Sequence, residues 1–160
     1  MTTLITTHDG LAYDHLGLRI RVPLQGRDTE DRFALMEQSG RRGAAVPVHR
    51  HSREAETFFV LDGELDAWSN GEHSVVAAGS TLYLPPHIDH AFAVRSATAR
   101  FLLLLTPSGF EQFFITDGQP ASTGADLPPI PGPPPADEIA RLADLLRTYG
   151  VELVGPPPGS

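Results

Sequence analysis

The chain has 160 residues, of which 41% are hydrophobic and 20% charged, a composition typical of one soluble globular domain. Its 20 acidic and 12 basic residues give a formal charge of −8, so the positive surface that binds phosphates is missing and we expect no nucleic-acid partner. It contains no Cys, and all of its basic residues are Arg, which excludes thiolate nucleophiles, iron–sulfur ligands, disulfides and Schiff-base lysines.

The first residues carry no positive charge ahead of an apolar run, and no stretch approaches the length of a transmembrane helix. We therefore expect a cytoplasmic protein with no membrane partner. Gly and Pro, with 15 residues each, favour many short strands over long helices.

Short β-favouring runs separated by turn residues extend from about Leu16 to Leu105. Within 57–76, Asp62-Gly63 and Asn70-Gly71 each have the composition of a two-residue hairpin loop, which predicts a three-stranded antiparallel meander. Many short strands with close turns predict an all-β fold, a single antiparallel β-barrel or jelly roll. Further strands are expected at 17–22, 32–36, 80–84, 91–94 and 100–105.

The run Phe101–Leu105 does not alternate between polar and apolar residues, which indicates a strand that is buried on both faces. One face would lie inside the barrel and the other under another element or a partner subunit, so we expect a homodimer. After Pro107, the side chains of Phe110, Phe113 and Phe114 would share one side of a short helix. We interpret these rings as packing and not as a ligand-binding cluster.

The domain organisation follows from the composition. Residues 1–118 are expected to form the barrel domain with the short helix, and residues 119–135, rich in Pro, Gly and Ser, a linker or strap. Residues 136–160 are expected to form a C-terminal helix and tail that pack on the barrel. Apolar residues at helical spacing place this helix from about Asp137 to Tyr149, and Val151–Val154 follows as a candidate edge strand.

Two histidines stand two residues apart in a stretch that Pro47 favours as extended chain. On a strand, His49 and His51 project from the same face with Cα atoms roughly 6.5–7 Å apart, so both imidazoles can reach one ion. On a helix they would point about 200° apart. Glu56 opens the next strand and can return a carboxylate towards them. A mixed nitrogen and oxygen set suits Mn, Fe, Co, Ni or Zn better than Mg or Ca.

This spacing resembles the first motif of the cupin superfamily, which runs Gly, five residues, His-x-His, three or four residues, Glu, six residues, Gly. Gly43, His49, His51, Glu56 and Gly63 match every position. The second cupin motif is matched by Gly79, Pro85 and His90, whereas His87 stands where the family has Gly and Val94 where it has Asn. The resemblance covers about residues 30–115. It implies a cupin barrel and a divalent transition metal, Fe, Mn, Ni, Co or Zn, held by His49, His51, Glu56 and His90.

Strand parity extends this prediction to a substrate pocket. Phe58 and Val60 share the parity of Glu56, and Phe92 that of His90, so they should continue inward as pocket wall or as barrel core. Tyr83 and His87 are further candidates for substrate contacts, with a surface or capping role as the alternative for His87. Trp68 and Glu37 are weaker candidates. Three histidines without a spacing partner, His8, His15 and His73, are expected to face solvent, as are Arg50 and Arg53 beside the ligands.

Among cupins, the chain is most similar to small bacterial proteins described as quercetin 2,3-dioxygenase-like. The resemblance implies a metal-dependent dioxygenase with O2 and a chelating enol, phenol or diketone as substrates. It also implies a catalytic role for Glu56, because the corresponding glutamate of quercetinase-type cupins is thought to take the substrate proton. Two alternatives stay open: a non-redox isomerase, cyclase or lyase, and a metal-binding sensor without turnover.

Overall fold

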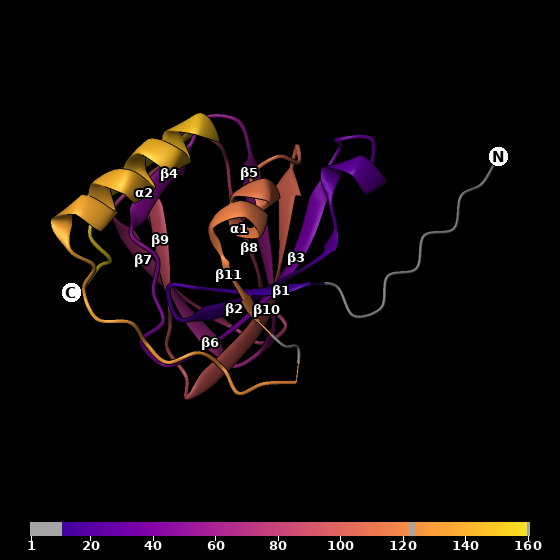
Figure 1. Ribbon diagram of the computed structural model, residues 1–160. Coiled ribbons are helices and arrows are strands. Elements are labelled where there is room, and N and C mark those ends of the chain that lie inside the picture. Colours follow the sequence, from indigo (N-terminus) through magenta and orange to yellow (C-terminus); the bar gives the residue numbers. More distant parts are fainter. Residues whose placement is uncertain (1–10, 122–123, 160) are drawn as a thin grey trace.

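The computed structural model describes residues 11–121 and 124–159, which form two antiparallel β-sheets that face each other (Figure 1). The all-β fold predicted from the sequence is confirmed. The strands of the larger sheet, in pairing order, are β11 Gln119–Ala121, β1 Ala12–His15, β2 Leu18–Leu24, β3 Ala34–Arg41, β10 Thr98–Thr106, β5 Ala55–Asp62 and β8 Thr81–Leu84. Those of the smaller sheet are β12 Val151–Gly155, β4 Val48–His51, β9 His90–Val94, β6 Glu64–Ser69 and β7 Glu72–Ala77.

The core lies between the two sheets and is filled by alternate residues of the strands. In β5, Phe58 and Val60 are fully buried, whereas Phe59 between them is 39% exposed. The rings of Phe58, Phe92 and Phe101 contact one another, with centroids 5.3–5.7 Å apart. Removal of these rings from water stabilises the sandwich and fixes which side of each strand faces inward.

The segment 57–76 differs from the predicted meander. β6 and β7 form the expected hairpin, with Asn70 (φ 50°) and Gly71 (φ 82°) at its tip. β5 and β6 do not pair, because β5 belongs to the larger sheet and β6 to the smaller one. Gly63 has a φ of 77°, and a Cβ at this position would lie 2.3 Å from the carbonyl oxygen of Thr98. Gly63 therefore marks a crossing between the sheets and not a hairpin turn.

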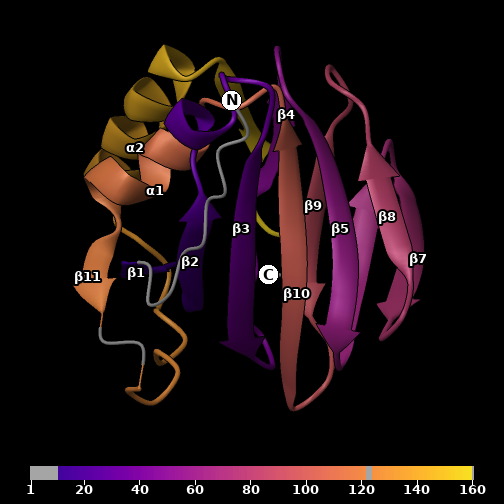
Figure 2. The same ribbon diagram turned by 90° about the vertical axis from the view of Figure 1, so that its right-hand side faces the viewer.

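The helices gather on one side of the barrel, beside β1 and β2 (Figure 2). Leu142 and Leu146 on the second α-helix are buried in the core cluster, so this helix packs on the barrel as expected. No helix of the described residues is long and apolar enough to cross a membrane. The helical segments are the 3₁₀ turn η1 Gly26–Asp28, α1 Glu111–Asp117 and α2 Ala136–Thr148.

The segment expected to be a linker is attached to the barrel at several points. Strand β11 pairs with β1, and the backbone carbonyls of Ala125 and Leu127 accept hydrogen bonds from Arg19 and Arg41. The C-terminal tail forms β12, which pairs with β4. The candidate edge strand is thus present, next to the strand that carries His49 and His51.

The outer face of β10 is less covered than the inner face. Phe101 and Leu103 are buried, whereas Leu102 and Leu104, which point outward, are partly exposed in the single chain. Phe59 on the neighbouring β5 shares this outer face. Such an apolar face suits burial against a second copy, and the homodimer stays a prediction.

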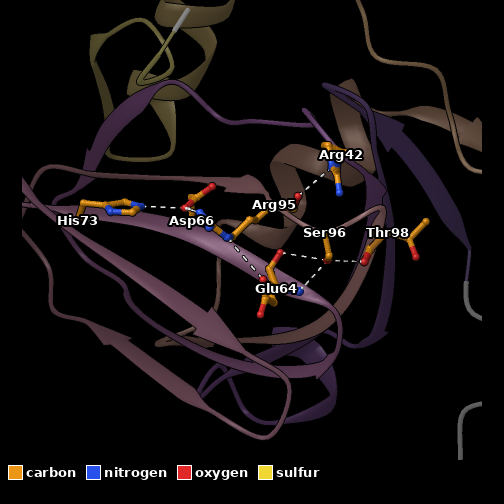
Figure 3. A network of polar contacts seen from close by, with 7 residues as sticks. All are labelled: Arg42, Glu64, Asp66, His73, Arg95, Ser96 and Thr98. Carbon is orange, nitrogen blue, oxygen red and sulfur yellow. Dashed lines mark hydrogen bonds and ion pairs between the residues drawn. The ribbon is translucent and has the colours of Figure 1, made fainter.

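A polar network holds the turn between β9 and β10 against β6 on the outside of the smaller sheet (Figure 3). Arg95 donates a hydrogen bond to Asp66, which also contacts His73, and the Ser96 hydroxyl accepts a hydrogen bond from the backbone N–H of Glu64. Exposed ion pairs of this kind contribute little stability each. The network fixes the path of the turn, and His73 is exposed as predicted from the sequence.

The turn between β8 and β9 contains a residue in an unfavourable conformation. His87 has a φ of 68°, in the left-handed region that Gly adopts more easily than other residues. Its backbone N–H donates a 2.7 Å hydrogen bond to the carbonyl oxygen of His51, so the turn is tied to β4 in this conformation. His87 stands where the second motif has Gly. The turn therefore forms with a residue whose Cβ makes this backbone conformation less stable.

We predict that His87→Gly raises the free energy of unfolding by roughly 0.5–1 kcal/mol. Gly removes the cost of the left-handed conformation, but it also increases the conformational entropy of the unfolded chain, which offsets part of the gain. Denaturant unfolding of the wild type and the variant measures the difference. His87→Ala is the matched control, because it removes the imidazole and keeps the Cβ. If the Ala variant is as stable as the Gly variant, the backbone at this position is not strained.

Candidate metal centre

The four predicted ligands converge from the two sheets onto one point in the interior. His49 and His51 lie on β4, and His90 lies on β9 directly opposite His49 in the register. Glu56 comes from β5 of the facing sheet. One ligand atom from each of the four residues lies within 4.8 Å of the others. The His-x-His spacing works because alternate residues of β4 share a face, as expected from the sequence.

Each imidazole is held by a hydrogen bond at its Nδ1 atom. Nδ1 of His49 lies 2.8 Å from the carbonyl oxygen of Pro47, and Nδ1 of His90 lies 2.9 Å from that of Ile88. Because a carbonyl oxygen only accepts, both Nδ1 atoms carry a proton. Nδ1 of His51 lies 3.3 Å from a carboxylate oxygen of Glu54. These contacts leave the Nε2 atoms on the side of the cluster, where that of His90 contacts the Glu56 carboxylate at 2.8 Å.

Electrostatics within the cluster are strongly coupled. Burial opposes the charge on Glu56, but the nearby imidazoles of His51 and His90 outweigh it and lower the pKa of Glu56 to about 2. Burial together with His90 lowers the pKa of His49 to about 3. Burial also acts against protonation of His90, but the 2.8 Å contact of its Nε2 with Glu56 prevails and raises its pKa. At neutral pH, Glu56 is therefore an anion and His49 a neutral imidazole.

The donor set fits a divalent transition metal. Nε2 of His51 is buried without a hydrogen-bond partner among the described residues, an arrangement that costs free energy unless an ion or water binds there. Three imidazole nitrogens and one carboxylate suit Fe, Mn, Co, Ni or Zn and leave coordination positions open for a substrate. The cluster can bind such a metal.

An apolar cavity reaches the cluster from the side of the helices. His49 and Glu56 are part of its wall, and the ring of Phe110, which precedes α1, packs edge-on against His51 at 4.7 Å. Most of the wall comes from hydrophobic side chains, which exclude water from the cluster. The other lining residues are His15, Leu16, Leu18, Gln38, Val46, Pro47, Phe92, Leu103, Phe113, Phe114, Leu142, Leu146, Val151 and Leu153.

Among the residues predicted to contact substrate, only Phe92 lines the cavity. Phe58 and Val60 are fully buried core residues outside its lining. Tyr83 is 61% exposed on the outer face of β8, because its parity is opposite to that of Leu84. His87 is exposed in its turn and takes the surface alternative that we left open.

Several cavity residues were not expected from the sequence. His15 was expected in solvent, but its ring is partly buried with edge contacts to Phe113 and Phe114 at 5.1 and 5.9 Å. The three Phe side chains that we interpreted as packing also line the cavity. Their helical spacing indicated an apolar face, but only the fold shows that this face covers the barrel mouth.

The remaining candidates lie outside the cavity. Glu37, on the outer face of β3, forms ion pairs with two arginines of the neighbouring strands. Trp68 of β6 packs beside His73 of β7. Arg53 is exposed as expected, and Arg50 is partly exposed and contacts acidic side chains of neighbouring segments. His8 lies outside the described residues.

Glu54 is a further residue that sequence reasoning missed. It is 1% exposed and its carboxylate holds Nδ1 of His51, the arrangement in which a second carboxylate orients a metal-binding imidazole and increases its basicity. Nothing in the linear spacing separates it from the neighbouring turn residues. Its position directly before β5 turns it inward.

We predict that Glu54→Gln weakens metal binding about tenfold, because the amide keeps an acceptor for His51 but removes the negative charge. Competition with a chromogenic chelator measures the affinity. Glu152→Gln makes the same change at a position with a 60% exposed side chain and serves as the control. Equal affinities for the two variants would show that Glu54 does not act on His51.

We also predict an effect of His15 on acid stability. Burial lowers the pKa of His15 below 6.5, and the opposing effect of Asp117 does not cancel it. The unfolded chain therefore takes up this proton at higher pH than the folded chain, so the stability is complete above pH 6.5 and is lost as the pH falls through the lowered pKa. Unfolding of His15→Gln should lose less stability than the wild type over that range. Parallel pH profiles would contradict the prediction.

Comparison with known proteins gives matches to cupins. Residues 40–105 match the family model of the cupin domain. Quercetin 2,3-dioxygenase of Bacillus subtilis (strain 168) is 28% identical over 100 residues, which are 62% of this chain and 30% of the relative. The match thus spans less than a third of the relative's length.

Solved structures share the fold. An RmlC-like cupin from Shewanella frigidimarina has a TM-score of 0.56 and 22% identity, over 66% of this chain and 88% of that one. A predicted oxalate decarboxylase from Thermotoga maritima has a TM-score of 0.59 and 15% identity, over 66% of this chain and 99% of that one. The match to the cupin-domain model covers both histidine-bearing motifs, and the two-sheet fold is cupin-like, in agreement with the resemblance read from the sequence.

Proposed function

We propose that the protein is a metal-dependent dioxygenase that cleaves a chelating enol, phenol or diketone with O2. The observation that carries the proposal is the convergence of three imidazoles and one carboxylate at an apolar cavity. The 28% sequence identity to a quercetin 2,3-dioxygenase over 100 residues supports this substrate class. The set of three neutral ligands and one anion favours an anionic bidentate substrate, because a divalent ion would keep a net positive charge.

A divalent Fe, Mn, Co or Ni ion held by His49, His51, Glu56 and His90 would supply Lewis acidity towards the substrate hydroxyl and the redox capacity for reaction with O2. Glu56 can accept the proton of that hydroxyl, since it is ionised at neutral pH. Its low pKa makes it a weak base, so it accepts the proton only from a hydroxyl that is itself acidified.

The cavity wall contributes by excluding water. Phe110 lies against His51, and Phe113 and Phe114 continue the wall towards α2. An electron-rich enolate in this space is protected from reprotonation by solvent, which favours its reaction with O2. The same apolar wall suits the aromatic or extended carbon skeleton of a phenol or enol.

A non-redox isomerase, cyclase or lyase is the principal alternative. The same ligands can acidify a C–H or O–H bond without O2, and the fold similarity to a predicted oxalate decarboxylase is compatible with this chemistry. A metal-binding sensor is the third possibility. The cytoplasmic location, the homodimer and the absence of nucleic-acid and membrane partners stay predictions from the sequence.

We predict that protein purified without added metal contains a divalent transition metal and consumes O2 with chelating hydroxyketones and diketones. His49→Ala and His90→Ala should lose most of the metal by elemental analysis and the O2 uptake with it. Glu56→Gln, reloaded with metal, should lower turnover about 100-fold or more through loss of the proton acceptor. His73→Ala, which removes an exposed imidazole, is the control and should keep both properties.

Two outcomes would overturn the proposal. Turnover of these substrates under strict anaerobiosis would favour the non-redox alternative. Unchanged metal content in both His→Ala variants would show that the cluster does not hold the metal.

A further inference from the structure

One buried polar side chain lines the cavity without a hydrogen-bond partner among the described residues. Gln38 lies on β3 and is 2% exposed, and its side chain points inward with the parity of Met36. Its cross-strand neighbours are Ile20 on β2 and Phe101 on β10, both fully buried and apolar. Gln38 thus interrupts an otherwise hydrophobic inner face.

The amide of Gln38 makes no hydrogen bond within the described part of the chain, and its atoms are not among the fully enclosed polar atoms, so it opens on the cavity that it lines together with His49 and Glu56. A buried amide without a partner costs free energy, and a hydrophobic side chain of the same size would pack at this position without that cost. Packing of the core therefore does not explain why this position carries an amide. An amide that opens on a ligand cavity is explained if a ligand group completes its hydrogen bonds.

His15 is the second polar group of this kind. Its ring is packed against the edges of Phe113 and Phe114 and lines the same cavity, and no hydrogen bond to its ring nitrogens is formed within residues 11–121 and 124–159. Among the described residues that line the cavity, Gln38 and His15 are the polar side chains that do not belong to the metal cluster. Both come from the sheet region that precedes the cupin-matched segment.

We propose that Gln38 and His15 form a polar subsite that binds a hydroxyl or carbonyl substituent of the substrate, separate from the group that chelates the metal. The inference rests on the proposed function. It restricts the proposed substrates to chelating compounds that carry a second polar substituent. An amide both donates and accepts, so it recognises either group. Sites with such buried polar groups reject analogues that lack the matching substituent, because the protein group is then left unpaired.

Binding of two probes to the Zn²⁺-loaded protein under argon tests the subsite without requiring turnover. 3-Hydroxyflavone carries the chelating hydroxyketone alone, and quercetin carries the same group with further hydroxyls. The wild type should bind quercetin about tenfold more tightly than 3-hydroxyflavone. Gln38→Met, which keeps the length of the side chain and removes its hydrogen bonds, should abolish most of this preference, and His15→Leu should reduce it. Metal content should not change in either variant.

Thermal unfolding of the ligand-free protein provides a second readout. Gln38→Met should raise the midpoint of unfolding, because it removes an unpaired buried amide, whereas the loss of a structural hydrogen bond would lower it. Gln119→Met is the matched control, since it makes the same change on exposed strand β11 and should alter neither property.

The outcomes separate the two proposals. If both probes bind and Gln38→Met keeps the wild-type preference, or if this variant is less stable than the wild type, the subsite is wrong and the proposed function is unaffected. If neither probe binds to the wild type, the chelating substrate class is wrong, and the proposed function fails together with the subsite.

Discussion

The metal centre depends on one constraint, the facing of two sheets at a distance at which a carboxylate from one meets three imidazoles from the other. Neither sheet can form the site alone, because Glu56 lies on β5 and the histidines lie on β4 and β9. The packed rings of Phe58, Phe92 and Phe101 follow Glu56 and His90 along the same inner faces and set the separation of the sheets. Core packing and ligand geometry are thus two consequences of the same strand parity.

Burial of the four candidate ligands costs free energy, and hydrogen bonds to the imidazole rings offset part of this cost. Three imidazoles and a carboxylate are brought out of water, with an unpaired Nε2 on His51. Each ring is fixed through Nδ1 to a backbone carbonyl or to Glu54, so the chain holds the ligand geometry before a metal binds. Preorganisation of this kind lowers the cost of metal binding, because the side chains do not have to be ordered at that step.

The sequence predicted the clustering of the four candidate ligands because their signal is local and chemical. His-x-His works only in extended chain, and the register of two motifs placed Glu56 and His90 correctly. The tertiary features were less accessible. Asp62-Gly63 has hairpin composition, but a crossing between sheets demands the same positive φ, so local sequence cannot separate the two. His15 was expected in solvent because its burial depends on α1, about a hundred residues further along the chain.

The candidate ligands and the cavity wall come from different parts of the chain. All four ligands lie within residues 40–105, the segment that matches the cupin model. Most of the wall lies outside it: Gln38 and the β1–β2 residues precede the segment, and α1, α2 and β12 follow it. The tail also forms the β-ladder beside the strand that carries His49 and His51. The match to the cupin model therefore includes the four clustered residues, whereas most of the cavity wall comes from parts of the chain that the match does not cover.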